Sequence, residues 1–171
     1  MTEPERYYGK YRGTVLNNED PMREGRLTLQ IPDVLGPAPS NWALPCLPVG
    51  GKQMGLWALP PVSAGVWAEF EQGDLTKPIW SGLWLGKDDE LPVLSNAVLP
   101  DLKNIVLQTT GQTTLMLSDL PGPNGGILLS APTGALISIT DIGITLSNGK
   151  GASIVFAGPS VAINVHGLVV T

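Results

Sequence analysis

Eight short apolar segments follow one another between residue 104 and the end of the sequence. In each segment aliphatic side chains alternate with other residues, and this period of two is typical of a strand that buries one face. Most segments begin about seven to nine residues apart, which indicates short strands joined by tight turns, as in a β-solenoid or β-helix. The segments are 104–110, 114–118, 126–130, 135–140, 143–147, 152–156, 160–164 and 167–171.

Residues that favour turns separate the segments. Thr110-Gly111, Pro132-Thr-Gly134, Asn148-Gly149-Lys-Gly151 and Gly158-Pro159 supply the positive and restricted φ angles that corners need. The aliphatic pairs of the segments are Ile105/Leu107, Leu115/Leu117, Ile127/Leu129, Ile137/Ile139, Ile144/Leu146, Ile154/Phe156 and Val161/Ile163.

A single copy of this repeat would leave an apolar face and unpaired strand edges in water, which ordinarily leads to aggregation. The only formally charged side chains after residue 103 are Asp119, Asp141 and Lys150. The simplest closure wraps three copies around one axis, so we predict one third of an intertwined trimeric β-helix, with Ile139 facing that axis. About eight layers at ~4.8 Å would give a rod on the order of 40 Å long.

The residues before 104 differ in composition, because they contain nearly all the charged residues, all five Trp and all three Tyr. Five short, bent strands are indicated there, and they suggest an OB-type barrel. In the clearest of them Val66, Ala68 and Phe70 alternate with Trp67, Glu69 and Glu71. We predict an all-β chain with an OB-fold domain at 1–87, a linker at 88–103 and a β-helix spike domain at 104–171.

Charge and cysteine content exclude several classes of protein. The formal net charge is −5 and the pI is about 4.7, which argues against a nucleic-acid partner. Cys46 is the only cysteine, so an intrachain disulfide is impossible, and we expect a small core hydrophobe. The sequence shows no basic-then-apolar signal pattern and no run near the ~20 apolar residues of a membrane span. We expect synthesis in the cytoplasm without a signal peptide.

Two parts of the sequence resemble one known family. Tyr8-Gly-Lys-Tyr-Arg-Gly13, Asp20-Pro21 and Ile31-Pro32 resemble the opening of the phage baseplate assembly protein V family. Gly65-Val-Trp-Ala-Glu-Phe-Glu71 with Lys77-Pro-Ile-Trp-Ser-Gly82 resembles the barrel signature of the same family. The order of an OB barrel followed by a trimeric β-helix is also similar to the spike proteins of type VI secretion and other contractile injection systems.

The resemblance implies a homotrimeric central spike in the baseplate of a contractile tail, residing in a phage virion, a tailocin or a cellular injection particle. Its barrels would seat on the baseplate hub at the end of the tail tube, and its β-helix would puncture the target cell envelope on sheath contraction. The chain lacks the lysozyme-like insertion and the His-x-His of some relatives. The resemblance therefore implies no enzyme activity and a separate PAAR-like tip protein at the C-terminal end.

Two groups of residues could carry chemistry, and each has a simpler interpretation. His166, the only histidine, could meet its two symmetry mates and bind a metal, although a lone histidine is more often a surface or turn residue. Strand alternation puts Glu69 and Glu71 on one face near Asp74, which could supply an acid and a base for glycosidic cleavage. An exposed strand face and a turn account for these carboxylates without catalysis. We predict no catalytic, cofactor-binding or metal site.

The tryptophans Trp42, Trp57, Trp67, Trp80 and Trp84 could stack bases or sugars, but the acidity disfavours bases. Core packing and contact with the hub is the preferred interpretation. The alternative function is a carbohydrate- or envelope-binding OB/β-solenoid module, such as a tail-fibre tip. Such a module would lose sugar or oligonucleotide affinity when Trp67 or Trp80 is changed.

Overall fold

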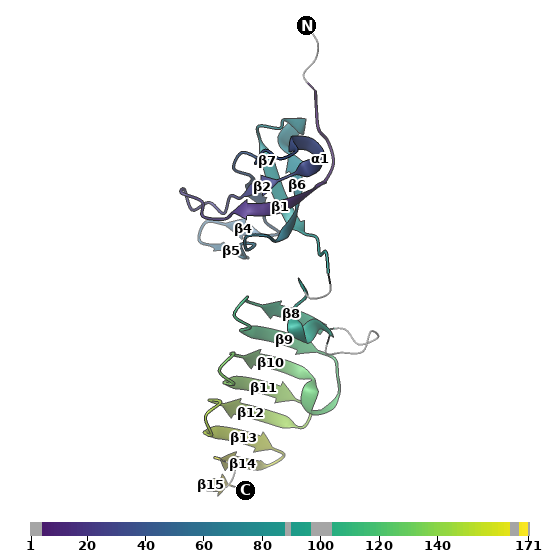
Figure 1. The fold of residues 1–171 in the computed structure, drawn as a ribbon. Helices are drawn as coiled ribbons and strands as arrows, with labels where there is room; N and C mark the ends of the chain where they lie inside the picture. Colours follow the sequence, from purple (N-terminus) through teal and green to yellow (C-terminus); the bar gives the residue numbers. More distant parts are fainter. Residues whose placement is uncertain (1–4, 88–89, 97–103, 165–167, 171) are drawn as a thin grey trace. The chain divides into compact units, whose positions relative to one another are not determined.

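The computed structural model describes residues 5–87, 90–96, 104–164 and 168–170 of the chain (Figure 1). It divides into two compact units, Met1–Gly86 and Lys87–Thr171. The linker predicted at 88–103 lies in part outside the described residues, and the domain bounds stay a prediction. Within the described ranges no helix is long and apolar enough to cross a bilayer.

The first unit is built on a five-stranded sheet. Its strand order is β2-β1-β6-β7-β3, and all neighbours are antiparallel except the parallel pair β3 and β7. One helical turn, α1 (Pro32–Leu35), follows β2, because Pro32 cannot continue a strand ladder and suits the first turn of a helix. The strands are β1 (Tyr11–Asn17), β2 (Thr28–Gln30), β3 (Leu44–Cys46), β6 (Gly65–Phe70) and β7 (Pro78–Leu83), with a small hairpin of β4 (Gly50–Gly51) and β5 (Met54–Gly55).

The two ends of this sheet meet, which closes it into a small barrel. Leu27 lies next to β2, and Ala43 lies next to β3 at the opposite end of the strand order. The Leu27 N–H donates to the Ala43 carbonyl at 3.1 Å, and the Ala43 N–H donates to the Leu27 carbonyl at 2.7 Å. The predicted OB-type barrel is therefore confirmed.

The barrel core follows strand alternation. Val66, Ala68 and Phe70 are buried, while Trp67 and Glu69 on the other face of β6 are half-buried. The complete buried cluster comprises Val15, Leu27, Leu29, Ile31, Ala43, Val66, Ala68, Phe70 and Trp80. Burial of such side chains is the main stabilising term of a small barrel.

Cys46 is exposed, so its predicted place in the core is wrong. The chain alternates through β3: Ala43 is buried, Pro45 is half-buried, and Leu44 and Cys46 face outward. The surrounding sequence is apolar at almost every position, so its pattern does not reveal which side faces the core.

Asp20 holds the loop between β1 and β2. Its carboxylate accepts hydrogen bonds from Nη2 and Nε of Arg26, at 2.6 and 3.1 Å, and from the N–H groups of Met22 and Glu24, at 3.0 and 2.8 Å. The Arg26 guanidinium lies 5.7 Å from the centre of the Trp42 ring. Arg26 first, and then these backbone N–H groups, hold the pKa of Asp20 well below its usual range.

We expect this carboxylate to make the first unit acid-sensitive. The pKa of Asp20 is about 3.9 in an unfolded chain and lower in the fold, so the ionised carboxylate stabilises the folded state fully above the unfolded-state pKa. This stabilisation is lost as the pH falls through the folded-state pKa. We expect the Asp20→Asn variant to have a lower urea midpoint than wild type at pH 7, measured by tryptophan fluorescence. Its midpoint should also fall less than that of wild type between pH 5 and 2. Glu19→Gln, at an exposed neighbour, is the control; an acid dependence equal to wild type in Asp20→Asn would refute this role.

The second unit is a ladder of eight strands that pair in the order of the chain (Figure 1). Every neighbouring pair is antiparallel. The predicted strands are confirmed, with bounds that differ by a residue or two. They are β8 (Asn104–Gln108), β9 (Thr114–Ser118), β10 (Gly126–Ser130), β11 (Leu136–Thr140), β12 (Gly143–Ser147), β13 (Ser153–Ala157), β14 (Ser160–Ile163) and β15 (Leu168–Val170), with the short helices η3 (Val93–Asn96) and η4 (Gly122–Asn124).

Hairpin turns produce this order. Gly134, Gly149 and Gly158 have φ angles of 85°, 70° and 54°, which reverse the chain between successive strands. The ladder of the described strands is thus made within one chain. Whether three chains also wind around one another stays a prediction.

Two glycines allow the strands to approach closely. Gly126 and Gly143 begin β10 and β12 with positive φ angles of 77° and 155°. A Cβ at Gly126 would overlap the carbonyl oxygen of Ile139, and one at Gly143 would overlap that of Phe156. Both positions therefore require glycine.

Candidate functional site on one face of the ladder

Fourteen large apolar side chains form two columns on one face of the ladder, which we call the aliphatic face. Directly opposed residues of antiparallel strands lie about 4.5–5.5 Å apart, so each column is continuous. The first column is Ile105, Leu117, Ile127, Ile139, Ile144, Phe156 and Val161; the second is Leu107, Leu115, Leu129, Ile137, Leu146, Ile154 and Ile163.

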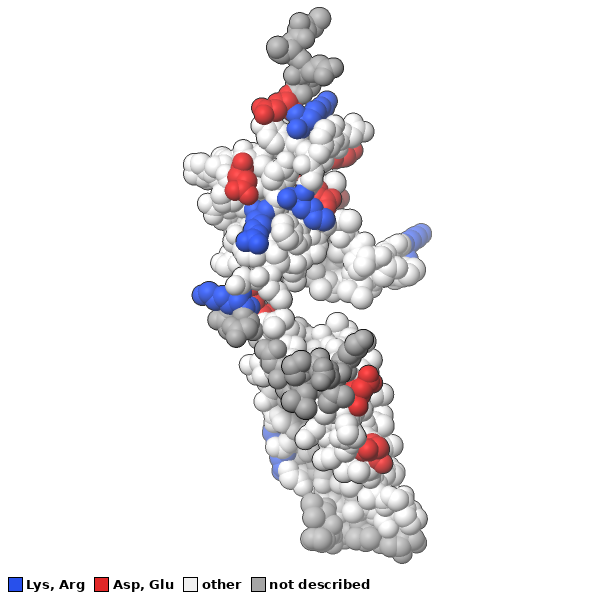
Figure 2. All heavy atoms as spheres, turned by 90° about the vertical axis from the view of Figure 1, so that its right-hand side faces the viewer, with Lys and Arg blue, Asp and Glu red and all other residues white. Residues whose placement is uncertain are grey.

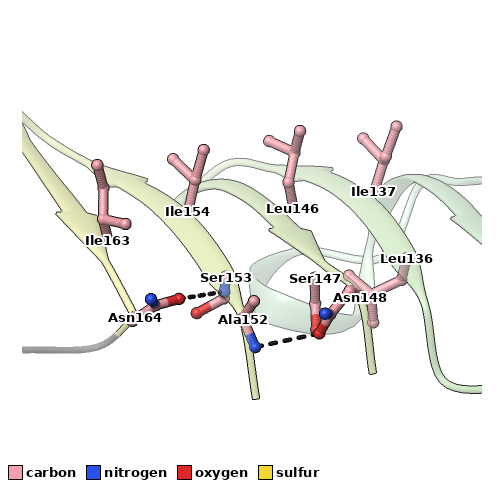
Figure 3. Close-up of a pocket in the computed structure, with 10 residues that line it drawn as sticks. All are labelled: Leu136, Ile137, Leu146, Ser147, Asn148, Ala152, Ser153, Ile154, Ile163 and Asn164. Atoms are coloured by element: carbon pink, nitrogen blue, oxygen red, sulfur yellow. Dashed lines mark hydrogen bonds between the residues drawn. The ribbon is translucent and has the colours of Figure 1, made fainter. Parts of the chain in front are cut away.

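Figure 3 shows part of the second column. Ile137, Leu146, Ile154 and Ile163 come from four successive strands and point in the same direction. At the margin of this face, Asn164 Oδ1 accepts the Ser153 N–H at 3.0 Å. These side-chain hydrogen bonds complete the backbone pairing at the turns, so the columns stand on a regular ladder.

The aliphatic face is uncovered in a single chain. Ile105 is 63% exposed, and in the middle of the ladder Ile139 is still 40% exposed. A soluble monomer rarely exposes a contiguous apolar patch of this length. Because each fully buried aliphatic side chain contributes about 1.5–3 kcal/mol, burial of this face against other copies would be strongly favourable.

The opposite face has another composition. Its central column begins with Val106, Met116 and Leu128 and continues with Ser138, Thr145, Val155 and Ala162. Figure 2 shows few charged atoms over this unit on the side it presents. Asp119, Asp141 and Lys150 lie in turns and not on the aliphatic face. Nothing charged therefore opposes close contact of that face with another copy.

The carboxylates that could have formed an acid/base site lie in a turn or are held by other partners. β6 ends at Phe70, and Glu71 begins the short turn η1 (Glu71–Gly73), in which Gln72 has a φ of 53°. The Asp74 carboxylate accepts the Thr76 N–H at 2.9 Å and the Thr76 hydroxyl at 2.8 Å, which lowers its pKa. This is a turn-stabilising arrangement.

Glu69 is paired with Lys10. The Lys10 ammonium donates to Glu69 and, at 2.9 Å, to Ser81, whose hydroxyl lies 3.2 Å from the same carboxylate oxygen. The hydrogen bond from Lys10 lowers the pKa of Glu69. A general acid of a glycosidase needs the opposite shift, so these groups are organised as a surface ion pair.

The Glu69→Gln variant should change stability little. Lys10 is 53% exposed at its side chain, and exposed ion pairs contribute roughly 0–1 kcal/mol. Urea unfolding followed by tryptophan fluorescence would measure the difference, with Glu71→Gln as the control. A loss of several kcal/mol would show that the pair has a structural role that its exposure does not suggest.

The tryptophans occupy several environments. Trp80 is buried and donates its indole N–H to the Gly25 carbonyl at 2.9 Å, so it cannot stack a sugar. Trp84 is half-buried, donates to the Gly13 carbonyl at 3.1 Å and lies 5.1 Å from the Arg12 guanidinium. Trp42 and Trp67 are half-buried. Core packing is confirmed for Trp80, whereas Trp57 is 62% exposed.

The metal hypothesis for His166 falls outside the described residues. Among the residues with assigned positions, no cluster of three or more His, Cys, Asp or Glu side chains could hold a metal ion.

Two family models match the chain. Residues 11–85 match the type VI secretion system/phage-baseplate injector OB domain, and residues 104–169 match the phage baseplate V C-terminal trimerisation domain. The first match coincides with the barrel, and the second coincides with the ladder that bears the aliphatic face. The chain belongs to the phage baseplate V spike family. No curated protein matches it.

Membership in the baseplate V family indicates the oligomeric state of the second unit. The matched C-terminal domain is a trimerisation domain, so the chain forms a homotrimer through this unit. The protein has a structural role in the baseplate spike of a phage or type VI secretion system, and it resides in the tail of such a particle.

A second apolar surface of this baseplate V protein was not predicted from its sequence. The outer face of the first three strands is also apolar, and Met116 is 6% exposed there. The signal was present, because Val106, Met116 and Leu128 occupy the positions that Ser138 and Thr145 take in later strands.

Proposed function

We propose that the homotrimer is the passive piercing element of the contractile tail. Its barrels dock on the hub at the end of the tail tube, and its ladder is driven through the target cell envelope when the sheath contracts. The observation that carries this proposal is the aliphatic face. Three such faces packed around an axis make a solid rod, and a rod without an internal channel acts as a wedge.

The direction of the hydrogen bonds suits this task. In an antiparallel ladder they run perpendicular to the strands, and hence along the ladder. In the trimer, a load along the axis would be shared by three sheets, and in each sheet it would act along the hydrogen bonds between neighbouring strands. The scarcity of charge after residue 103 also lowers the cost of passing a low-dielectric membrane.

Exposed apolar side chains on the first unit support docking on the hub. Val49, Met54, Leu56 and Trp57 are all about half exposed or more and lie on or beside β4 and β5. We expect Met54→Ser combined with Leu56→Ser to abolish co-purification with the hub protein while the trimer persists. Leu85→Ser, at another exposed position, is the control. Retained co-purification in the double variant would exclude this surface.

The far end of the ladder suits a separate PAAR-like tip protein. β15 is the last strand of the sheet, so one of its edges has no partner strand within the described chain. Unpaired backbone groups of an edge strand are a template for another chain.

The puncturing step can be tested with particles that carry a protease-cleavable epitope in the turn at Lys150. After contraction on intact cells, the epitope should become accessible to a protease confined to the periplasm. An epitope that remains accessible only from outside the cell would refute puncturing. Particles locked in the extended state are the control.

A further inference from the structure

Burial in the second unit is confined to one end of the ladder. Among its described residues the buried ones are Thr114, Met116, Ser118 and Gly125. The first three belong to β9, and Gly125 closes the loop that follows. A second layer therefore covers the ladder only near its first strands.

Two short helical segments supply this cover. η3 contacts β8, and the Asn104 side-chain amide donates to the Leu94 carbonyl at 3.0 Å. The loop between β9 and β10 contains η4, which contacts β11, and the Gly122 N–H donates to Asp141 Oδ2 at 3.0 Å. Figure 1 shows both helical turns beside the first half of the ladder. Leu94, Leu120 and Met116 face a common hollow between the cover and the ladder.

The later strands have no comparable cover within one chain. In β12, β13 and β14 no described residue is buried. Their outward central residues are Thr145, Val155 and Ala162, which are smaller than Met116 and Leu128. These strands form a single layer that water reaches on both sides.

A single layer is a poor starting point for assembly. Isolated hairpins are marginally stable in water, and independent stability needs several strands with a hydrophobic face or packing against a helix. Both ends of the ladder have several strands with an apolar face, but among the described strands only β9 has buried side chains, and the helical segments of the cover contact β8 and β11. The two ends of the ladder should therefore differ in local stability.

We propose that the trimer assembles in one direction, from β8 to β15. The first three strands and their cover form a structured nucleus in each chain, and three nuclei meet through Ile105, Leu107 and the aliphatic residues of β9 and β10. Each later strand then pairs with a neighbour that the trimer has already ordered. This inference rests on the homotrimer and is independent of hub docking and puncturing.

The order can be measured on the full chain during refolding from denaturant. In pulse-labelled hydrogen exchange, amides of β8, β9 and β10 should gain protection before those of β12, β13 and β14. Simultaneous protection of all strands, or earlier protection of the far end, would overturn the proposal.

A matched pair of substitutions tests the same order by rates. Ile127→Val in β10 and Ile163→Val in β14 remove the same methylene from the aliphatic face at opposite ends. Ile127→Val should slow the appearance of trimer roughly tenfold, and Ile163→Val should mainly speed dissociation in SDS, because only contacts formed early change the assembly rate. Equal slowing by both would contradict directional assembly.

The Met116→Ala variant tests the role of the nucleus without changing the aliphatic face. Met116 lies on the opposite face from Leu115 and Leu117, so the substitution deletes no part of the aliphatic face. It should nevertheless slow assembly at least as much as Ile127→Val. An unchanged assembly rate would show that the cover has no part in starting the trimer. If Met116→Ala yields no folded chain, the two valine variants decide.

Discussion

Ile139→Asp is expected to abolish the trimer. Ile139 lies in the middle of the first column, with Ile127 and Ile144 directly opposite on the neighbouring strands. In a closed trimer the variant would place three carboxylates among aliphatic side chains, and burial of an unpaired charge costs several kcal/mol or more. Light scattering on purified protein should show only monomer or aggregate.

Thr145→Asp is the matched control for this experiment. Thr145 lies on the neighbouring strand β12, directly opposite Ser138, and its side chain lies on the face of the sheet away from Ile139. The control should remain a trimer that resists SDS without heating. A soluble Ile139→Asp trimer would show that the aliphatic face does not face the axis.

Leu29→Ala should destabilise the barrel by about 2–5 kcal/mol, the usual range for deletion of a fully buried leucine. Leu29 has no exposed surface and belongs to the central cluster of the first unit. All five Trp lie before residue 87. Tryptophan fluorescence therefore reports the unfolding of this unit alone, and urea midpoints give the difference directly.

Leu44→Ala is the control for the barrel. Leu44 is 48% exposed on β3, so the same chemical deletion leaves no cavity. Its effect should stay below about 1 kcal/mol. A loss of similar size in both variants would mean that burial does not determine the stability of this unit.

The strands of the ladder could be predicted closely because their signal is local. Alternating pairs such as Ile137/Ile139, with Gly134 and Gly149 at the turns, determine where each strand begins and ends and which face is apolar. The need for other copies also followed from sequence, because a single layer of strands leaves one apolar face in water. Both inferences depend only on neighbours within a few residues.

Some positions could be assigned to the core or the surface only from the tertiary structure, because the alternation of apolar and polar residues leaves them ambiguous. Cys46 lies in a nearly continuous apolar run, so only the position of β3 beside β7 shows that it faces outward. Glu71 begins the short turn η1 after Phe70, which the alternation of residues does not reveal. The ion pair between Asp20 and Arg26 depends on the path of the loop between β1 and β2.

The all-β class, the eight short strands and their apolar face follow from the sequence, because residue type and the two-residue period of apolar side chains can be seen in any single segment. The tertiary structure showed that the strands pair as a meander, that two columns run across them, and that the buried side chains among the described residues of the ladder gather around Met116. These features arise from pairing between strands and from loops that fold back. Their energies depend on contacts between segments, which spacing along one chain does not specify.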